Sequence, residues 1–356
     1  MELISRESES SGKGQKSMDV LRGALRPIIH YLDSPDIQEI MINQPGEIWI
    51  ESRGSMQRAV EKLAPIAVEI AIKALASNNE KKKTPIMDAR LPGIRVAAVM
   101  SPVALNGHAM SIRKHGAQQI SLADYVAAGA FTPVDDYEKG LHDEGRALRP
   151  LAADVKRGGA ALQAFFTWAI SQRQNILISG GTSSGKTTLT NALLAEMPQH
   201  HRVITIEDTA ELKLSVPNRV SFEANKELAV DIRSLVRVCL RFRPDRIVVG
   251  EIRGAEAYDL VDSLNTGHSG GITTIHADSA ESALDRLENL MRMSPETANY
   301  PNESMRRQIA QTFRFIVQAA NIGGMRGPVR VVEVTGYEQG KYQFNELFSR
   351  LPKEYL

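Results

Sequence analysis

The chain has 356 residues, of which 42% are hydrophobic and 24% charged, so it resembles ordinary globular proteins and is long enough for two domains. Its formal net charge of +1 provides no electrostatic footprint for a nucleic-acid partner, and its single cysteine, Cys239, excludes an intrachain disulfide framework. No apolar run approaches the roughly 20 residues that span a bilayer. We therefore expect a protein of the reducing cytosol that is not itself an integral membrane component.

The first part of the chain predicts a flexible tail and an α+β domain. Residues 1–16 are rich in Ser, Lys, Gly and Glu without an apolar period, which is typical of a tail. Residues 17–131 combine helical and strand-like apolar patterns, so we expect one smaller α+β domain there. Its expected elements are a helix over 20–32, strands over 37–42 and 47–50, a helix near 65–76, strands over 94–100 and 109–114, and a short helix that Ser121 caps.

A segment with prolines and glycines among many charges follows, and we expect a linker over residues 132–155. Residues 156–356 alternate between strands and helices, a pattern that favours a mainly parallel sheet with helices on both faces. The predicted fold class of this second domain is therefore α/β. Its expected elements are a helix over 160–170, strands over 175–179 and 203–207, a helix near 230–241, a strand over 246–250, a helix near 255–265, a strand over 272–276, and a hairpin of 329–335 with 341–347.

The segment after the strand at 175–179 matches the pattern G-x-x-x-x-G-K-[ST] at every fixed position. Its glycines let consecutive backbone N–H groups wrap a phosphate chain, and the helix that follows points its positive end at the same phosphates. We expect Lys186 to reach the β- and γ-phosphates of ATP and Thr187 to bind Mg²⁺. The loop alone does not separate an ATPase from a GTPase or a small-molecule kinase. The expected nucleotide-binding residues are Gly180, Gly181, Thr182, Ser183, Ser184, Gly185, Lys186, Thr187 and Thr188.

Acidic residues follow two further apolar strands. Glu251 comes after the strand at 246–250, and the carboxyl ends of such strands face the nucleotide, so we expect it to orient water and accept its proton. Glu207 and Asp208 end another strand and are expected in the Mg²⁺ and water network. The alternatives are a simple strand cap for Glu251 and a solvated turn for the other two acids.

Two histidines flank the strand at 272–276. His276 closes this strand, and His268 lies in the glycine-rich loop that precedes it. Either histidine could contact the γ-phosphate or carry the nucleotide state to a neighbouring subunit. An ordinary structural role is equally compatible with the spacing of each.

Taken together, the motifs resemble those of the type II/IV secretion ATPase superfamily, and within it those of the VirB-type traffic ATPases of type IV secretion and conjugation. The resemblance covers about residues 18–340, with the motifs in the family's order. Gly254 departs from it, because many members carry an acid there. The segments that carry the resemblance are 32–47 (LDSPDIQEIMINQPGE), 180–188 (GGTSSGKTT), 206–212 (IEDTAEL), 239–253 (CLRFRPDRIVVGEIR) and 266–277 (TGHSGGITTIHA).

This resemblance implies a RecA-like P-loop ATPase domain and a homohexamer of two stacked rings, with ATP and Mg²⁺ bound between the two domains. The implied partners are inner-membrane components of the secretion channel, and the implied location is cytoplasmic, peripheral at the inner-membrane face. Arg241 and Arg253 also match family arginines, although a structural salt bridge explains either one almost as well. The implied catalytic residues are the arginines Arg95 and Arg113, the acid box Glu207 and Asp208, the glutamate Glu251, and the histidine box His268 and His276.

These patterns favour a hexameric motor that hydrolyses ATP to energise type IV secretion, whether substrate transfer, pilus assembly or conjugative DNA transfer. The alternative is a nucleotide-gated ring assembly factor that acts by binding, but a pure switch needs no water-activating acid such as Glu251. A small-molecule kinase is disfavoured, because no lid-like arginine cluster follows the loop. Sequence-specific binding of nucleic acid is not expected, since the charge is near neutral and only 5% of residues are aromatic.

Overall fold

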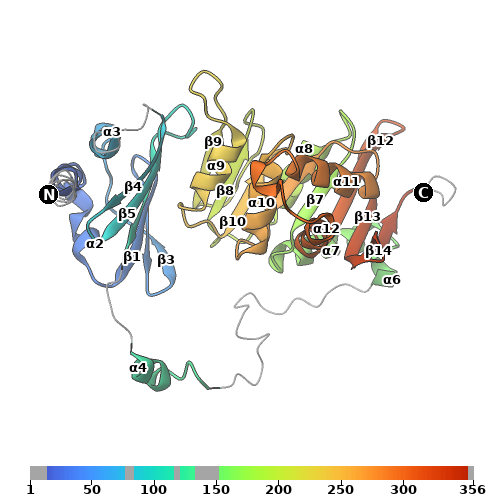
Figure 1. The fold of residues 1–356 in the computed structure, drawn as a ribbon, viewed down its shortest axis with the longest axis horizontal. Coiled ribbons are helices and arrows are strands. Elements are labelled where there is room, and N and C mark those ends of the chain that lie inside the picture. Colours follow the sequence, from blue (N-terminus) through green and yellow to red (C-terminus); the bar gives the residue numbers. More distant parts are fainter. Residues whose placement is uncertain (1–13, 77–83, 116–120, 133–151, 352–356) are drawn as a thin grey trace. The chain divides into compact units, whose positions relative to one another are not determined.

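The computed structural model describes residues 14–76, 84–115, 121–132 and 152–351, and they form two compact units (Figure 1). The first unit comprises Met1–Ser101 and Asn106–Leu148, and the second comprises Pro102–Leu105 and Arg149–Leu356. Most of the expected tail and most of the expected linker lie outside the described residues. None of the helices that are described is both long enough and apolar enough to cross a bilayer.

The first unit is an antiparallel sheet of six strands in the order β3-β2-β1-β6-β5-β4, with helices packed on one face. The expected strands and the helices near 65–76 and after Ser121 are present, strands β3 and β4 are additional, and the helix expected over 20–32 is interrupted. Its elements are a helix over 14–24, η1 (Arg26–Ile28), α2 (Ile29–Asp33), β1 (Ile37–Gln44), β2 (Glu47–Ser52), β3 (Ser55–Arg58), α3 (Pro65–Ala76), β4 (Ile86–Leu91), β5 (Ile94–Val99), β6 (Ala109–Lys114) and α4 (Leu122–Ala127).

The single helix expected over 20–32 is wrong in one respect, because it is interrupted. A turn and the 3-10 helix η1 separate the helix over 14–24 from α2. Pro27 lies within η1, and proline supplies no backbone N–H and clashes with the preceding turn of an α-helix. Leu21, Leu25 and Ile28 are nevertheless all buried, so the apolar pattern is preserved across the break.

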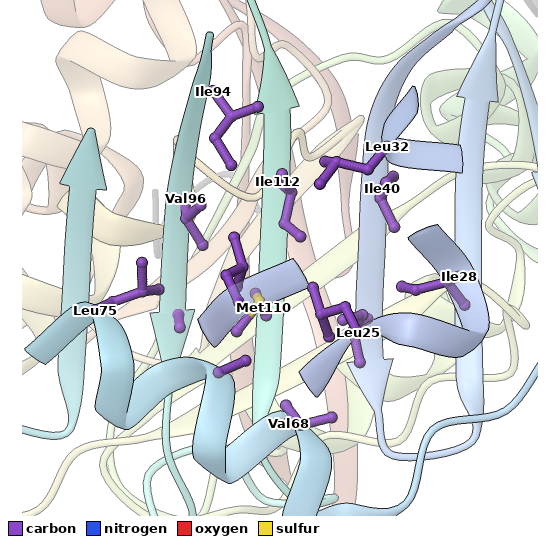
Figure 2. Packing of buried hydrophobic residues seen from close by; sticks show 14 of the residues in the cluster. Leu25, Ile28, Leu32, Ile40, Val68, Leu75, Ile94, Val96, Met110 and Ile112 are labelled. Atoms are coloured by element: carbon purple, nitrogen blue, oxygen red, sulfur yellow. The ribbon is translucent and has the colours of Figure 1, made fainter. Parts of the chain in front are cut away.

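The core of the first unit lies between these helices and the sheet. Ile40 of β1, Ile112 of β6 and Val96 of β5 are register partners in adjacent strands and are completely buried. Figure 2 shows their side chains gathered with those of Val68 from α3 and of Leu25 from the turn before η1. The alternation of side chains along each strand therefore directs one apolar set into this core.

The second unit is built on an eight-stranded sheet in the order β14-β13-β12-β7-β11-β10-β8-β9. The strands from β9 to β12 in this order are parallel, and β13 and β14 add an antiparallel edge. Its elements are α6 (Ala152–Val155), α7 (Gly159–Ser171), β7 (Ile176–Ser179), α8 (Lys186–Ala195), β8 (Val203–Glu207), β9 (Arg219–Glu223), α9 (Ile232–Cys239), β10 (Arg246–Val249), α10 (Glu256–Asn265), β11 (Ile272–Ile275), α11 (Ala280–Met291), η2 (Pro295–Thr297), α12 (Asn302–Thr312), β12 (Phe315–Ile322), β13 (Met325–Glu338) and β14 (Lys341–Ser349).

The central strands β7, β10 and β11 are buried along their whole length. Consecutive residues of a strand point to opposite faces, so both faces of the sheet are covered. This confirms the expected α/β class with a mainly parallel sheet. Because parallel strands end at one edge, the loops that leave β7, β8, β10 and β11 all emerge there.

A core substitution tests the packing of the first unit. Ile112→Ala is expected to lower the free energy of unfolding by about 2–5 kcal/mol, because it leaves a cavity beside Ile40 and Val96. Hydrogen exchange of the amides in the first unit measures this loss. Val20→Ala is the matched control, since Val20 is 46% exposed, and its exchange should stay close to that of the wild type. Equal protection in Ile112→Ala and the wild type would contradict this core.

Candidate nucleotide-binding site

A pocket of about 430 Å³ lies at the carboxyl edge of the eight-stranded sheet. Its walls come from the loop after β7 with the start of α8, from the loops after β8 and β10, and from the residue that follows β11. Arg326 of β13 completes the lining. Segments that are far apart in the sequence therefore meet around one cavity.

The loop between β7 and α8 packs so tightly that two positions require glycine. A Cβ atom on Gly180 would lie 2.4 Å from the carbonyl oxygen of Ala319 and 2.6 Å from Oγ of Ser184. Gly185 has a φ of +95°, and a Cβ there would lie 3.0 Å from Cβ of Arg326. The loop can close beneath a phosphate chain only because these two residues lack side chains.

Polar groups of this loop converge on the pocket. Nζ of Lys186 donates to the carbonyl oxygens of Gly180 at 2.8 Å and Gly181 at 2.9 Å, and burial lowers the pKa of this lysine. Oγ of Ser184 is buried and has no hydrogen-bond partner among the described residues. Thr187 lies in the first turn of α8 and lines the pocket. A cation, an unsatisfied hydroxyl and a helix N-terminus around one cavity fit a polyphosphate.

The expected acid Glu251 lines this pocket and belongs to a small network of charged side chains. Nη2 of Arg253 donates to Oε2 of Glu251 at 2.5 Å, and Nη1 donates to Oδ2 of Asp208 at 3.2 Å. Nε2 of His276 lies 3.1 Å from Oε1 of Glu251, without the alignment of a hydrogen bond. One guanidinium therefore joins two of the predicted site carboxylates, and one of the predicted histidines lies beside them.

Glu207 has a different environment from its neighbour Asp208. Its side chain is buried, and its Oε1 accepts hydrogen bonds from the backbone N–H groups of Glu211 at 2.9 Å and Leu212 at 3.0 Å. Burial raises the pKa of Glu207. Its Cγ would lie 3.0 Å from a Cβ on Gly250, so that glycine gives the carboxylate its space. In this structure Glu207 holds the loop after β8 in place at the edge of the pocket.

The two histidines of the predicted pair lie at different places. His276 follows the carboxyl end of β11 and lines the pocket, whereas His268 precedes the amino end of the same strand and does not. The loop of His268 is fixed by Asn175, whose Oδ1 accepts from the N–H groups of Gly270 and Gly271 at 2.7 and 2.9 Å. Nδ1 of His268 is buried without a partner in the described part of the chain, and burial lowers the pKa of this imidazole.

The two predicted arginines belong to the first unit, where they are register partners on β5 and β6. Arg95 forms two hydrogen bonds with the carboxylate of Asp88, at 2.9 and 2.6 Å. Arg113 is exposed, and it pairs with no carboxylate among the residues that the structure describes. The two side chains therefore differ in how readily they could move to another partner.

The described residues contain no group of three His, Cys, Asp or Glu side chains that could hold a metal ion. The pocket lining still fits Mg²⁺, because this ion keeps several waters and takes few protein ligands besides substrate phosphates. Thr187 and Asp208 both line the pocket and could supply such oxygen ligands.

Sequence reasoning missed two features of this pocket. The sequence allowed a structural salt bridge for Arg253 but did not identify Glu251 and Asp208 as its partners, and no motif pointed to Arg326. The glycine-rich turn at Gly323 and Gly324 and the strand pattern before it were the available signals for a hairpin that could carry Arg326. No local motif indicates that this hairpin returns to the phosphate-binding loop.

Comparisons with known proteins agree with this geometry. Residues 155–320 match the protein family described as "Type II/IV secretion system protein". The conjugal transfer protein TrbB of Rhizobium radiobacter is 34% identical over 320 residues, which cover 88% of each chain. The type IV secretion system protein VirB11 of Brucella suis is 34% identical over 310 residues, covering 83% of this chain and 84% of VirB11. The crystal structure of the Brucella suis VirB11 ATPase in complex with sulphate superposes with a TM-score of 0.75 at 28% identity, covering 94% and 95% of the two chains.

Substitutions of Glu207 separate its hydrogen bonds from its charge. Glu207→Ala should lower the free energy of unfolding by about 1–3 kcal/mol, because two backbone N–H groups lose their acceptor. Glu207→Gln keeps an acceptor oxygen and should be close to the wild type near pH 4. Chemical denaturation of the three proteins measures these differences.

The dependence on pH follows from the raised pKa of Glu207. As pH rises above about 4.3, the unfolded chain ionises this residue before the folded protein does, so the wild type loses stability relative to Glu207→Gln. The loss is complete once pH exceeds the folded pKa. A difference between the two proteins that stays constant with pH would show that burial does not act on this carboxyl group.

Proposed function

Because this chain belongs to the family of type II/IV secretion system proteins and is a type IV secretion ATPase, we propose that it works as a homohexameric motor whose ATP hydrolysis energises transfer through a secretion or conjugation channel. The observation that carries the proposal is the position of Glu251 in the same pocket as the phosphate-binding loop. An acid there serves hydrolysis, whereas a protein that acts by nucleotide binding alone has no need of it.

The phosphate-binding loop supplies the nucleotide contacts in this proposal. Lys186 exchanges the carbonyl oxygens of its own loop for the β- and γ-phosphates, and the backbone N–H groups at the start of α8 bind the remaining phosphate oxygens. Thr187 supplies a hydroxyl ligand to Mg²⁺, which neutralises charge on the phosphates when it is bound. The unpartnered hydroxyl of Ser184 is available for one more hydrogen bond.

The acids of the pocket activate water. Glu251 orients the attacking water and accepts its proton, and His276, 3.1 Å from this carboxylate, contacts the γ-phosphate side of the pocket. Asp208 takes part in the Mg²⁺ and water network, and Glu207 contributes by holding the loop that carries Asp208. His268, outside the pocket, carries the nucleotide state towards a neighbouring subunit.

Arginines of the first unit complete the catalytic set. Arg113 is the better candidate to reach the phosphates, because it is exposed and no carboxylate of the described residues holds it, while Arg95 must first separate from Asp88. A guanidinium at the γ-phosphate stabilises the charge that spreads over its oxygens during hydrolysis. If nucleotide binding draws such an arginine to the phosphates, the two units would move relative to each other in every cycle of ATP hydrolysis.

The proposed partners are inner-membrane components of the secretion channel, since the VirB11 and TrbB relatives are named for type IV secretion and conjugal transfer. The corresponding location is the cytoplasmic face of the inner membrane, with peripheral attachment.

A concentration series tests the motor. Specific ATPase activity of the wild type should rise with protein concentration as rings form, and Glu251→Gln should lower turnover by at least about 100-fold at every concentration. Phosphate release measures both. Lys186→Ala is the control that removes the phosphate contact and should also be inactive. Wild-type turnover in Glu251→Gln would remove this residue as the base, and activity independent of concentration would argue against the ring.

A second substitution tests the first unit. Arg113→Ala should reduce the maximal rate by at least about 100-fold while the ring still assembles, because the guanidinium acts on the transition state. Steady-state kinetics with size-exclusion chromatography and light scattering separate the two effects. Lys73→Ala, at an exposed lysine of the same unit, serves as the control. Unchanged kinetics in Arg113→Ala would exclude this arginine from the mechanism.

A further inference from the structure

Arg326 is the one guanidinium or ammonium group of the pocket lining to which the described residues give no partner. Lys186 is held by two carbonyl oxygens, and Arg253 is shared between Glu251 and Asp208. Arg326 also lines the pocket, its side chain is exposed, and no hydrogen bond or ion pair engages it within the described ranges. Its charge is therefore available to a ligand.

The hairpin that carries Arg326 is held against the phosphate-binding loop. Strand β12 pairs with β7 up to Ser179 and then continues, so that the carbonyl oxygen of Ala319 lies beside Gly180. On the return strand β13, Cβ of Arg326 lies where a side chain on Gly185 would collide with it. Arg326 is thus fixed at its backbone close to the last glycine of the loop, and only its long side chain is free to reorient.

The order of the strands places Arg326 on the opposite side of the loop from the acids. In the order of the sheet, β8, β10 and β11 lie on one side of β7, and the loops that follow them carry Asp208, Glu251 and His276 (Figure 1 labels β7, β8 and β10). The strands β12 and β13 lie on the other side of β7 and bear Arg326. A triphosphate that runs across the loop with its γ-phosphate at Glu251 therefore has its nucleoside end on the side of the β12–β13 hairpin.

We propose that Arg326 binds the nucleoside end of ATP, where its planar guanidinium stacks on the base and donates to the ribose. This inference rests on the proposed function, since it assumes that the loop holds the phosphates. A guanidinium suits the task because it is planar, weakly hydrated and permanently charged, and it stacks on aromatic rings more readily than an ammonium group does. Arg326 is then a binding residue that selects a nucleotide over bare polyphosphate and has no part in the chemical step.

The test compares Arg326→Ala with the wild type in the full chain, using ADP and inorganic tripolyphosphate as probes. Loss of the stacking and hydrogen bonds should raise the Kd for ADP about tenfold. The Kd for tripolyphosphate, which has no nucleoside, should change by less than about twofold. The turnover number at saturating ATP should also stay within about twofold of the wild type, because Arg326 does not touch the reacting atoms. Isothermal titration calorimetry and phosphate release provide these values.

Met325→Ala is the matched control, since Met325 is the preceding residue of the same hairpin, is 63% exposed and does not line the pocket. It should bind both probes as the wild type does. Equal weakening of ADP and tripolyphosphate by Arg326→Ala would place the arginine at the phosphates and overturn the inference. An unchanged Kd for ADP, or a lower turnover number with unchanged binding, would overturn it as well. A wild-type protein that binds neither probe would overturn both this inference and the proposed function.

Discussion

The nucleotide site depends on how closely the backbone of the phosphate-binding loop approaches its neighbours. Gly180 has no room for a side chain between Ala319 and Ser184, and Gly185 faces Arg326 across a similarly short gap. These contacts set the loop against β12 and β13 on one side, while strand pairing ties β7 to β11 on the other. The loop is therefore shaped by the sheet around it as much as by its own sequence, and every other group of the pocket is positioned relative to it.

The parallel pairing of the strands is sufficient to bring the charged side chains of the site together, because it aligns the ends of the strands that carry them. Ile275 lies level with Ser179, and Val249 lies level with Ile206, so the residues that follow these strands emerge together. The central strands are apolar and both faces of the sheet are covered. Charged side chains therefore remain accessible at its carboxyl edge. Glu251, Asp208 and His276 meet there because their strands end there.

Much of this could be predicted from the sequence, because a motif such as the phosphate-binding loop encodes its own local geometry and because the continuously apolar strands β7, β10 and β11 stand out by composition. Strand β9 was missed because it lies at an edge and alternates in burial, so it lacks the continuous apolar run of the central strands. Helix α11 was missed although Ser279 and Ser282 form a capping box at its start. The placement of Arg326 beside Gly185 depends on the path of a hairpin more than 100 residues downstream, and no local pattern records that path.

The salt bridge between Arg253 and Glu251 determines which oxygen of this carboxylate remains free. With Glu251 as the proposed base, one of its two oxygens is occupied by a guanidinium that also serves Asp208. The other oxygen of Glu251, Oε1, has no hydrogen-bond partner among the described residues, so in the proposed mechanism Oε1 would accept the proton while Arg253 holds the carboxylate in place. In the proposed mechanism, water would then lose its proton to the oxygen that lies 3.1 Å from Nε2 of His276, and not to the oxygen that Arg253 holds.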